Sequence, residues 1–211
     1  SGPRNVSTAM MRAFSMRCDA VAVDEPFYGV FLARTGADHP MREAVLSAMP
    51  TDPEDVLARL FAPLPAGRRV HYQKHMTHHM AADVPTDWFG RVDHVFLIRR
   101  PEDVLASYAD RRERVALADI GFREQAEIFR TVRALTGRVP PVVDGRDVQA
   151  DPRGTLVRLC AALGIPFEEA MLSWPAGRRP EDGVWAEHWY AAVEASTGFR
   201  PPRPPLPRQA L

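Results

Sequence analysis

The chain has 211 residues, which at about 150 residues per domain fits one α/β-sized domain better than two. Hydrophobic residues make up 45% and charged residues 26% of the composition, which is ordinary for a globular protein and excludes global disorder. The 27 basic and 27 acidic residues give zero net charge, so nothing general favours nucleic acid or an anionic membrane as a partner. Because no apolar run reaches the roughly 20 residues of a membrane span, we expect a soluble, cytoplasmic protein.

Short apolar segments alternate with helical patterns along the chain. After a loop-like opening at Ser1, for which a preceding strand is expected, apolar residues recur at helical spacing from Ser7 onward. Strands are expected at 20–24, 69–73, 93–98 and 141–144. Further helices are expected up to about residue 61 (one of them opened by Pro53), from Pro101, and at 122–135, 152–163 and 185–196.

This alternation predicts the α/β class, with a central parallel sheet covered by helices on both faces as a three-layer sandwich. Residues 1–199 are expected to form the single domain. The remaining residues, 200–211, form a proline-rich tail that cannot continue a helix or a central strand.

Two junctions between a strand and a helix are typical of phosphate binding, because backbone N–H groups and the helix dipole point at an anion there. At the first, Ser7 and Thr8 can donate hydroxyl groups at the start of a helix, directly after Arg4, Asn5 and Val6. At the second, Arg99 ends a predicted strand. The loop lacks the G-x-x-x-x-G-K-[ST] pattern of nucleoside triphosphate loops, and an ordinary capped helix remains the alternative for it.

The spacing of Arg99 and Ser107 resembles the 3'-phosphate-binding signature of the sulfotransferases that use 3'-phosphoadenosine 5'-phosphosulfate (PAPS). The opening loop 4–8 resembles the 5'-phosphosulfate loop of that family, which usually reads Lys-Ser-Gly-Thr-Thr. Arg178 and Arg179, ahead of Asp-Gly-Val-Trp, resemble the basic pair that clamps the 3'-phosphate. In addition, the segments SGPRNVSTAMMRAF, VDEPFY, YQKHM and HWYAAVEASTGF resemble bacterial sulfotransferase-like proteins related to branched-chain-aminotransferase-like fusions.

The resemblance implies a P-loop-type fold and in-line transfer of a sulfonyl group from PAPS to the hydroxyl or amine of a small acceptor, without a metal. It also implies the cofactor-binding residues, which are Arg4, Asn5, Val6, Ser7, Thr8, Arg99, Ser107, Arg178 and Arg179. Arg4 takes the place of the loop cation. By the same resemblance His75 is the general base, and Lys74, the only lysine of the chain, is the second candidate for assisting the leaving group.

Other interpretations stay open at this point. A metal site is conceivable at His71, His75, His78 and His79, although lining of the acceptor pocket fits the last two better. An ATP-dependent phosphotransferase would need metal-holding acids, for which Asp24 is the obvious candidate, and a non-catalytic nucleotide-binding or interaction module is the third option. Residues 27–61 are expected either to shape an apolar acceptor pocket or to form ordinary core, and a homodimer is one option for assembly.

Overall fold

The computed structural model describes residues 1–3, 5–80, 84–109 and 120–202, with backbone only at 106–109. Its helices and strands alternate as the sequence predicts, which confirms the α/β class. The strands are β1 (Ala20–Asp24), β2 (Val70–Lys74), β3 (Phe96–Ile98) and β4 (Val142–Asp144). The α-helices are α1 (Ser7–Ser15), α2 (Tyr28–Thr35), α3 (Arg42–Ala48), α4 (Pro53–Leu60), α5 (Pro101–Ala109), α7 (Phe122–Thr136), α8 (Gly145–Ala150), α9 (Pro152–Ala162), α10 (Ala186–Trp189) and α11 (Ala191–Glu194). Three short 3₁₀ helices are η1 (Thr77–His79), η2 (Asp87–Arg91) and η3 (Glu169–Leu172).

The described strands pair in parallel, as predicted, but they form two pairs rather than one continuous sheet. β1 pairs with β2 from Ala20↔Val70 to Asp24↔Lys74, and β3 pairs with β4 from Phe96↔Val142 to Ile98↔Asp144. A cavity of about 550 Å³ lies between the two pairs and is lined by residues of both β2 and β3. The strand expected before Ser1 stays a prediction.

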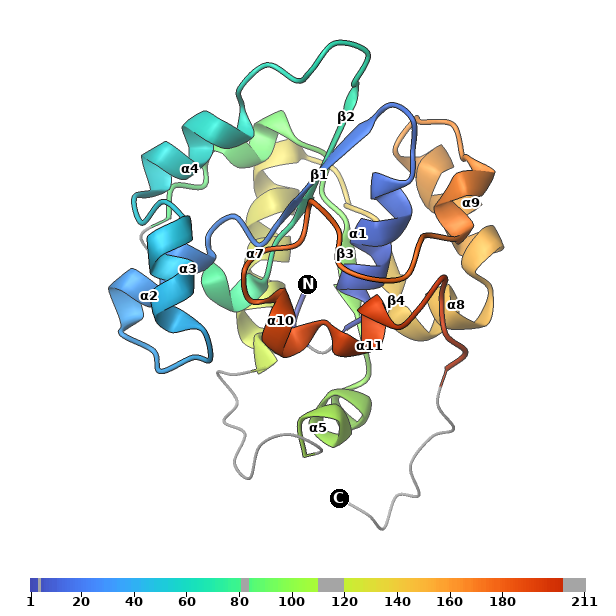
Figure 1. The fold of residues 1–211 in the computed structure, drawn as a ribbon. Helices are drawn as coiled ribbons and strands as arrows, with labels where there is room; N and C mark the ends of the chain where they lie inside the picture. The colour runs from blue at the N-terminus through green and yellow to red at the C-terminus, as the bar shows by residue number, and fades with distance from the viewer. Residues whose placement is uncertain (4, 81–83, 110–119, 203–211) are drawn as a thin grey trace.

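Ser1 lies at the rim of this cavity, near the centre of the molecule (Figure 1). Its amino group donates to the carbonyl of His75 at 2.9 Å, and its carbonyl accepts from the N–H of Thr77 at 2.9 Å. This is the hydrogen-bond pattern of a parallel strand that runs beside β2.

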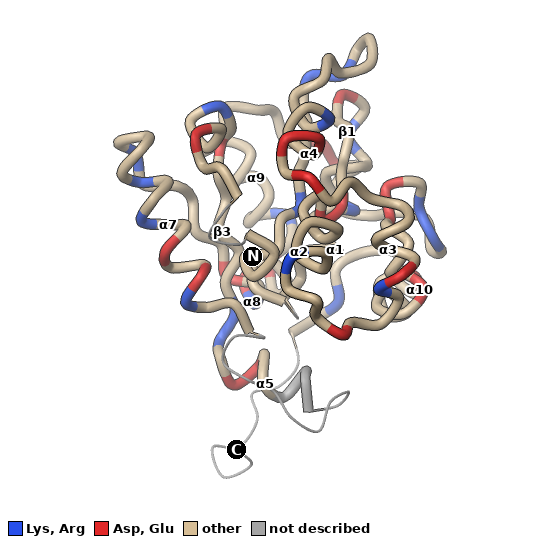
Figure 2. Tube along the Cα trace, turned by 90° about the vertical axis from the view of Figure 1, so that its left-hand side faces the viewer, with Lys and Arg blue, Asp and Glu red and all other residues tan. Residues whose placement is uncertain are grey.

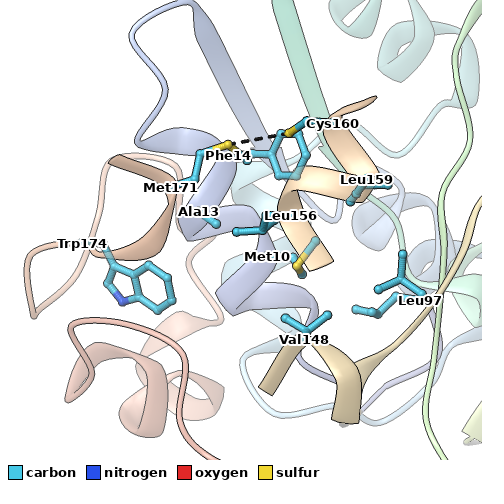
Figure 3. Packing of buried hydrophobic residues seen from close by; sticks show 11 residues of the cluster. Met10, Ala13, Phe14, Leu97, Val148, Leu156, Leu159, Cys160, Met171 and Trp174 are labelled. Carbon is cyan, nitrogen blue, oxygen red and sulfur yellow. Dashed lines mark hydrogen bonds between the residues drawn. The ribbon is translucent and has the colours of Figure 1, made fainter. Parts of the chain in front are cut away.

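Helices cover both faces of the strands, so the layered arrangement follows the prediction. Neighbouring residues of β3 enter different cores, because successive side chains of a strand point to opposite faces. Leu97 packs with residues of α1 and α9, such as Met10 and Leu156, in the cluster of Figure 3. Phe96 packs on the other face with Val132 of α7 and Trp88 of η2.

The predicted segments differ from the observed elements mainly at their ends. The strand predicted at 93–98 begins only at Phe96, and the helix predicted at 185–196 is two short helices, α10 and α11. Basic and acidic residues are interspersed along the trace (Figure 2), in keeping with the zero net charge. Among the described residues, every helix is too short or too polar to cross a lipid bilayer.

Candidate active site

A second cavity, of about 500 Å³, gathers the ends of β1, β2 and β3 with the start of α1. Further parts of its wall come from α2, from η1 and from the C-terminal segment 185–200, which contains α10 and α11, with single residues of α7 and α8. The sequence-predicted residues that line it are Asn5, Val6, Ser7, Thr8, Lys74, His78, His79 and Arg99. Segments far apart in the sequence therefore meet at one site, as expected for the carboxyl edge of parallel strands.

The loop before α1 is fixed by Asn5. The Asn5 amide donates to the carbonyl of Leu97 at 2.9 Å, and Asn5 Oδ1 accepts from the N–H of Val6 at 3.1 Å. Gly145 of α8 packs against this loop so closely that a Cβ there would lie 2.9 Å from Asn5 Oδ1. Val6 has a φ of −79°, a value that any residue adopts, so the loop does not need the glycine that the family usually has at this place.

Arg99 follows β3 directly and lines the cavity, whereas its neighbour Arg100 pairs with Asp103. The guanidinium of Arg100 forms two hydrogen bonds of 3.2 Å with the carboxylate of Asp103. Ser107 lies within α5, eight residues beyond Arg99, and its side chain is outside the described set. Arg4 also lies outside the described residues.

The structure does not bring Arg178 and Arg179 to this cavity. Arg178 is exposed and contacts the carbonyl of Gly183 at 3.4 Å. The backbone N–H of Arg179 donates to Asp182 at 2.8 Å, and this carboxylate also binds the buried Arg12 of α1 at 2.6 Å. The turn is thus fixed against α1, which argues against these two arginines as the phosphate clamp. Arg200, which lies beyond the predicted domain end, lines the cavity instead.

His75 also lies elsewhere. Its side chain lines the cavity between β2 and β3 and not the one that holds the loop and Arg99, whereas Lys74 lines both cavities. The ring lies near Phe27 and Trp88, and its Nε2 is 3.1 Å from the side-chain oxygen of Gln73. Burial lowers the pKa of His75 to about 3. The geometry therefore does not support His75 as the general base of this site.

Lys74 is 3% exposed and forms a buried network at the ends of β1 and β2. Its Nζ donates to Asp24 Oδ1 at 2.8 Å, to Glu25 Oε1 at 2.6 Å and to the hydroxyl of Tyr190 at 2.5 Å. Burial alone would lower the pKa of Lys74, but the two carboxyl groups outweigh burial and hold it well above its ordinary value. Lys74 is therefore a fixed ammonium group and a poor proton donor to a leaving group.

Glu25 is the residue of this network that the sequence-based reasoning missed. It lines the cavity directly after β1 and has a φ of 40°, which is uncommon for a residue with a Cβ. Burial raises the pKa of its carboxyl above the ordinary value, while Lys74 opposes this rise. The acid at the end of a buried strand was the signal available in the sequence, since the ends of parallel strands gather at the site.

Aromatic and imidazole rings form the wall beside Glu25. His79 is 3% exposed and stacks on Tyr28 with ring centroids 4.4 Å apart. Its Nδ1 is 3.8 Å from Glu25 Oε2, and burial lowers its pKa well below the ordinary value. Phe31 also stacks on His79, with ring centroids 4.9 Å apart. Of the segment 27–61, Tyr28, Phe31 and His39 reach the cavity.

The rest of that segment's buried apolar residues pack as ordinary core, for example Val30 and Val56. Within the part of the chain that the structure describes, no three His, Cys, Asp or Glu side chains are grouped so that they could hold a metal ion. Among the described residues, the cavity thus combines the start of α1, two arginines (Arg99 and Arg200), two glutamates (Glu25 and Glu124) and an aromatic wall.

The chain is similar to several known proteins. Two curated Arabidopsis thaliana proteins, branched-chain-amino-acid aminotransferase-like proteins 1 and 2, are 38% and 35% identical over 203 residues. The match covers 96% of this chain but only 36% of each relative, so the chain spans about a third of their length.

Two solved structures share the fold. The sulfotransferase domain from the curacin biosynthetic pathway has a TM-score of 0.53 at 16% identity, covering 94% of this chain and 81% of that domain. The sulfotransferase domain from the Synechococcus PCC 7002 olefin synthase has a TM-score of 0.57 at 20% identity, covering 92% and 83%. A family model described as a sulfotransferase domain matches residues 1–210. The chain belongs to the sulfotransferase family.

Proposed function

We propose that the protein transfers a sulfonyl group in line from PAPS to a hydroxyl or amine of a small acceptor. The observation that carries the proposal is the single cavity in which the loop 5–8, Arg99 and the Glu25 carboxyl meet. The first two suit the phosphates of a nucleotide, and the third suits a proton acceptor. Membership of the family supports transfer of a sulfonyl group as the reaction.

The residues present fit an anionic nucleotide. The first turn of α1 contains no acidic residue and no side chain caps it, so its backbone N–H groups are available to a phosphate. Arg99, together with Ser107 as the resemblance implies, would hold the 3'-phosphate, and Arg200 lines the same cavity as a further cation. When bound, PAPS supplies the sulfonyl group and takes the electron pair of the S–O bond that breaks, which leaves adenosine 3',5'-bisphosphate.

The side chains around the reacting group then have separate tasks. Glu25 takes the proton of the acceptor hydroxyl or amine while the new bond to sulfur forms, and its raised pKa suits that task. The resemblance implies that Arg4 is the loop cation; an arginine stays protonated, so it would stabilise the growing charge on the phosphate without giving up its proton. Lys74 acts on neither atom directly, since its three donor positions are used by Asp24, Glu25 and Tyr190.

The ATP-dependent alternative needs a lysine at the phosphates, and the only lysine of the chain is Lys74. Its ammonium group is bound by two carboxyl groups. This observation favours the sulfotransferase over the phosphotransferase.

Thermal unfolding with adenosine 3',5'-bisphosphate, with ADP, with ATP and magnesium, and without ligand tests the proposal. At about 100 times its dissociation constant the bisphosphate adds about 2.7 kcal/mol, which corresponds to roughly 5–10 °C for a chain of this size. We expect a shift with the bisphosphate and a much smaller one with ADP, which lacks the 3'-phosphate. A shift with ATP alone would favour the phosphotransferase. No shift with any of them would favour a non-catalytic module.

A further inference from the structure

The carboxyl group of Glu25 is held in one orientation by groups from two separate parts of the chain. Its Oε1 accepts from Lys74 Nζ of β2 at 2.6 Å and lies 3.4 Å from the hydroxyl oxygen of Tyr190. No described residue hydrogen-bonds to Oε2, and His79 Nδ1 of η1 lies 3.8 Å from it. One oxygen is thus anchored, and the other is left at the cavity wall for a proton.

The backbone of Glu25 is fixed equally firmly. Its φ of 40° costs about 1–2 kcal/mol for a residue other than glycine, so surrounding contacts must maintain it. The N–H of Glu25 donates to the carbonyl of Lys74 at 2.9 Å, and the carbonyl of Glu25 accepts from the N–H of Tyr28 at 2.9 Å. Lys74 therefore holds Glu25 through both its main chain and its side chain.

Tyr190 connects this pair to the C-terminal wall of the cavity. Its hydroxyl donates to Asp24 Oδ2 at 2.7 Å, accepts from Lys74 and receives a further hydrogen bond from Trp185 Nε1 at 3.2 Å. Tyr190 lies between α10 and α11, whose residues line the cavity opposite the loop. The same hydroxyl thus joins the wall that covers the site to the carboxyl group inside it.

We propose that Lys74 and Tyr190 are positioning residues that hold the Glu25 carboxyl group with Oε2 free to accept a proton. This inference rests on the proposed function for its catalytic meaning, but the contacts can be tested without a known acceptor. The charged or titratable groups that face Glu25 are Lys74, Asp24, Tyr190, His79 and the Ser1 amino group. Of these, Lys74 is the ammonium group in direct contact, so its removal leaves two buried carboxyl groups without their cation.

Carbon-13 NMR of glutamate side chains measures the pKa of Glu25 directly. The Glu25 signal is assigned by its loss in Glu25→Gln. The pKa of Glu25 is expected to rise by about one unit or more in Lys74→Met, a tenfold change in proton affinity. Tyr190→Phe keeps every charge and removes the hydroxyl that contacts Lys74, Asp24 and Glu25, so a smaller rise is expected. The matched control is Arg69→Met, because Arg69 is an exposed cation beside the start of β2 that contacts Asp19 at 3.4 Å; it should leave the Glu25 signal unchanged.

An unchanged Glu25 pKa in folded Lys74→Met would overturn the inference. If Lys74→Met does not fold, Tyr190→Phe decides, and an unchanged pKa there has the same meaning. Binding of adenosine 3',5'-bisphosphate separates the two proposals. Failure of the wild-type protein to bind it contradicts the proposed function, whereas the NMR result judges the positioning role on its own.

Discussion

The ammonium nitrogen of Lys74 lies 2.6 Å from Oε1 of Glu25, and both residues come from the ends of neighbouring parallel strands. The pair brings the chain's only lysine and a carboxyl group of raised pKa to the wall of the 500 Å³ cavity. A buried ion pair of this kind costs desolvation free energy, and fixing the geometry of a site is one recognised use for such a pair.

Glu25→Gln is expected to lower turnover by about 100-fold or more, because the amide cannot accept a proton from the acceptor. Affinity for adenosine 3',5'-bisphosphate should stay within about twofold, since Glu25 does not belong to the phosphate-binding loop. The turnover rate is measured as release of adenosine 3',5'-bisphosphate from PAPS in the presence of a panel of alcohols, phenols and amines as acceptors. Calorimetry measures the affinity for the bisphosphate. Full turnover in the variant would remove Glu25 from the mechanism.

Arg99→Ala is expected to weaken binding of adenosine 3',5'-bisphosphate by about 1.5–3 kcal/mol, or roughly ten- to a hundredfold, the typical loss of a hydrogen bond to a charged group. Adenosine 5'-phosphate should lose much less affinity. Arg100→Ala is the matched control, since Arg100 is the neighbouring arginine and pairs with Asp103. Equal losses in the two variants would count against a specific role for Arg99 at the 3'-phosphate.

Gly145→Ala is expected to displace the phosphate loop, because the new methyl group would meet Asn5 Oδ1 at 2.9 Å and Val6 Cγ2 at 3.4 Å. We expect bisphosphate affinity to fall by about 1 kcal/mol or more, roughly fivefold. Gly90→Ala serves as the control, since nothing lies within 4 Å of the added methyl group there. Calorimetric titration of both variants with the bisphosphate checks this. An unchanged affinity in Gly145→Ala would mean that the loop tolerates movement.

His75 is expected to affect stability in acid rather than catalysis. Burial lowers its pKa to about 3, so between pH 6.5 and 3 the unfolded chain takes up a proton at this ring and the folded protein does not. The free energy of unfolding therefore decreases as the pH is lowered through that window, by up to about 2 kcal/mol at pH 5. His75→Met should lose less stability between pH 7 and pH 5 than the wild type in urea unfolding.

Turnover of His75→Met should remain near that of the wild type. A loss of about 100-fold in that variant would restore His75 as the base.

An extended apolar segment joined to Ser1 is expected to stabilise the protein. The hydrogen bonds of Ser1 with the main chain at His75 and Thr77 direct such a segment into the 550 Å³ cavity, parallel to β2 and beside β3. Five residues rich in valine and isoleucine should raise the melting temperature by about 5 °C or more. A glycine-serine segment of the same length is the control, and an equal effect of both would contradict pairing in the cavity.

Much of the fold could be predicted from local pattern. Alternation of apolar strands with capped helices predicted parallel strands covered on both faces, and Pro53 and Pro152 do open α4 and α9. Strand ends were less accurate: the strand expected at 93–98 begins at Phe96, where the first hydrogen bond to β4 forms. The pattern of apolar residues indicates which segment is buried, whereas strand pairing depends on a partner strand that lies far away in the sequence.

The family, the α/β class, and the loop and the arginine at two strand-to-helix junctions could be predicted from the sequence, because these are local patterns of spacing and residue type. Which charged groups face one another depends on the tertiary structure. It places His75, Arg178 and Arg179 outside the cavity that holds the loop and brings Glu25 and Tyr190 together. The physical reason is that a buried charge takes its role from its partners, and 165 positions separate these last two residues.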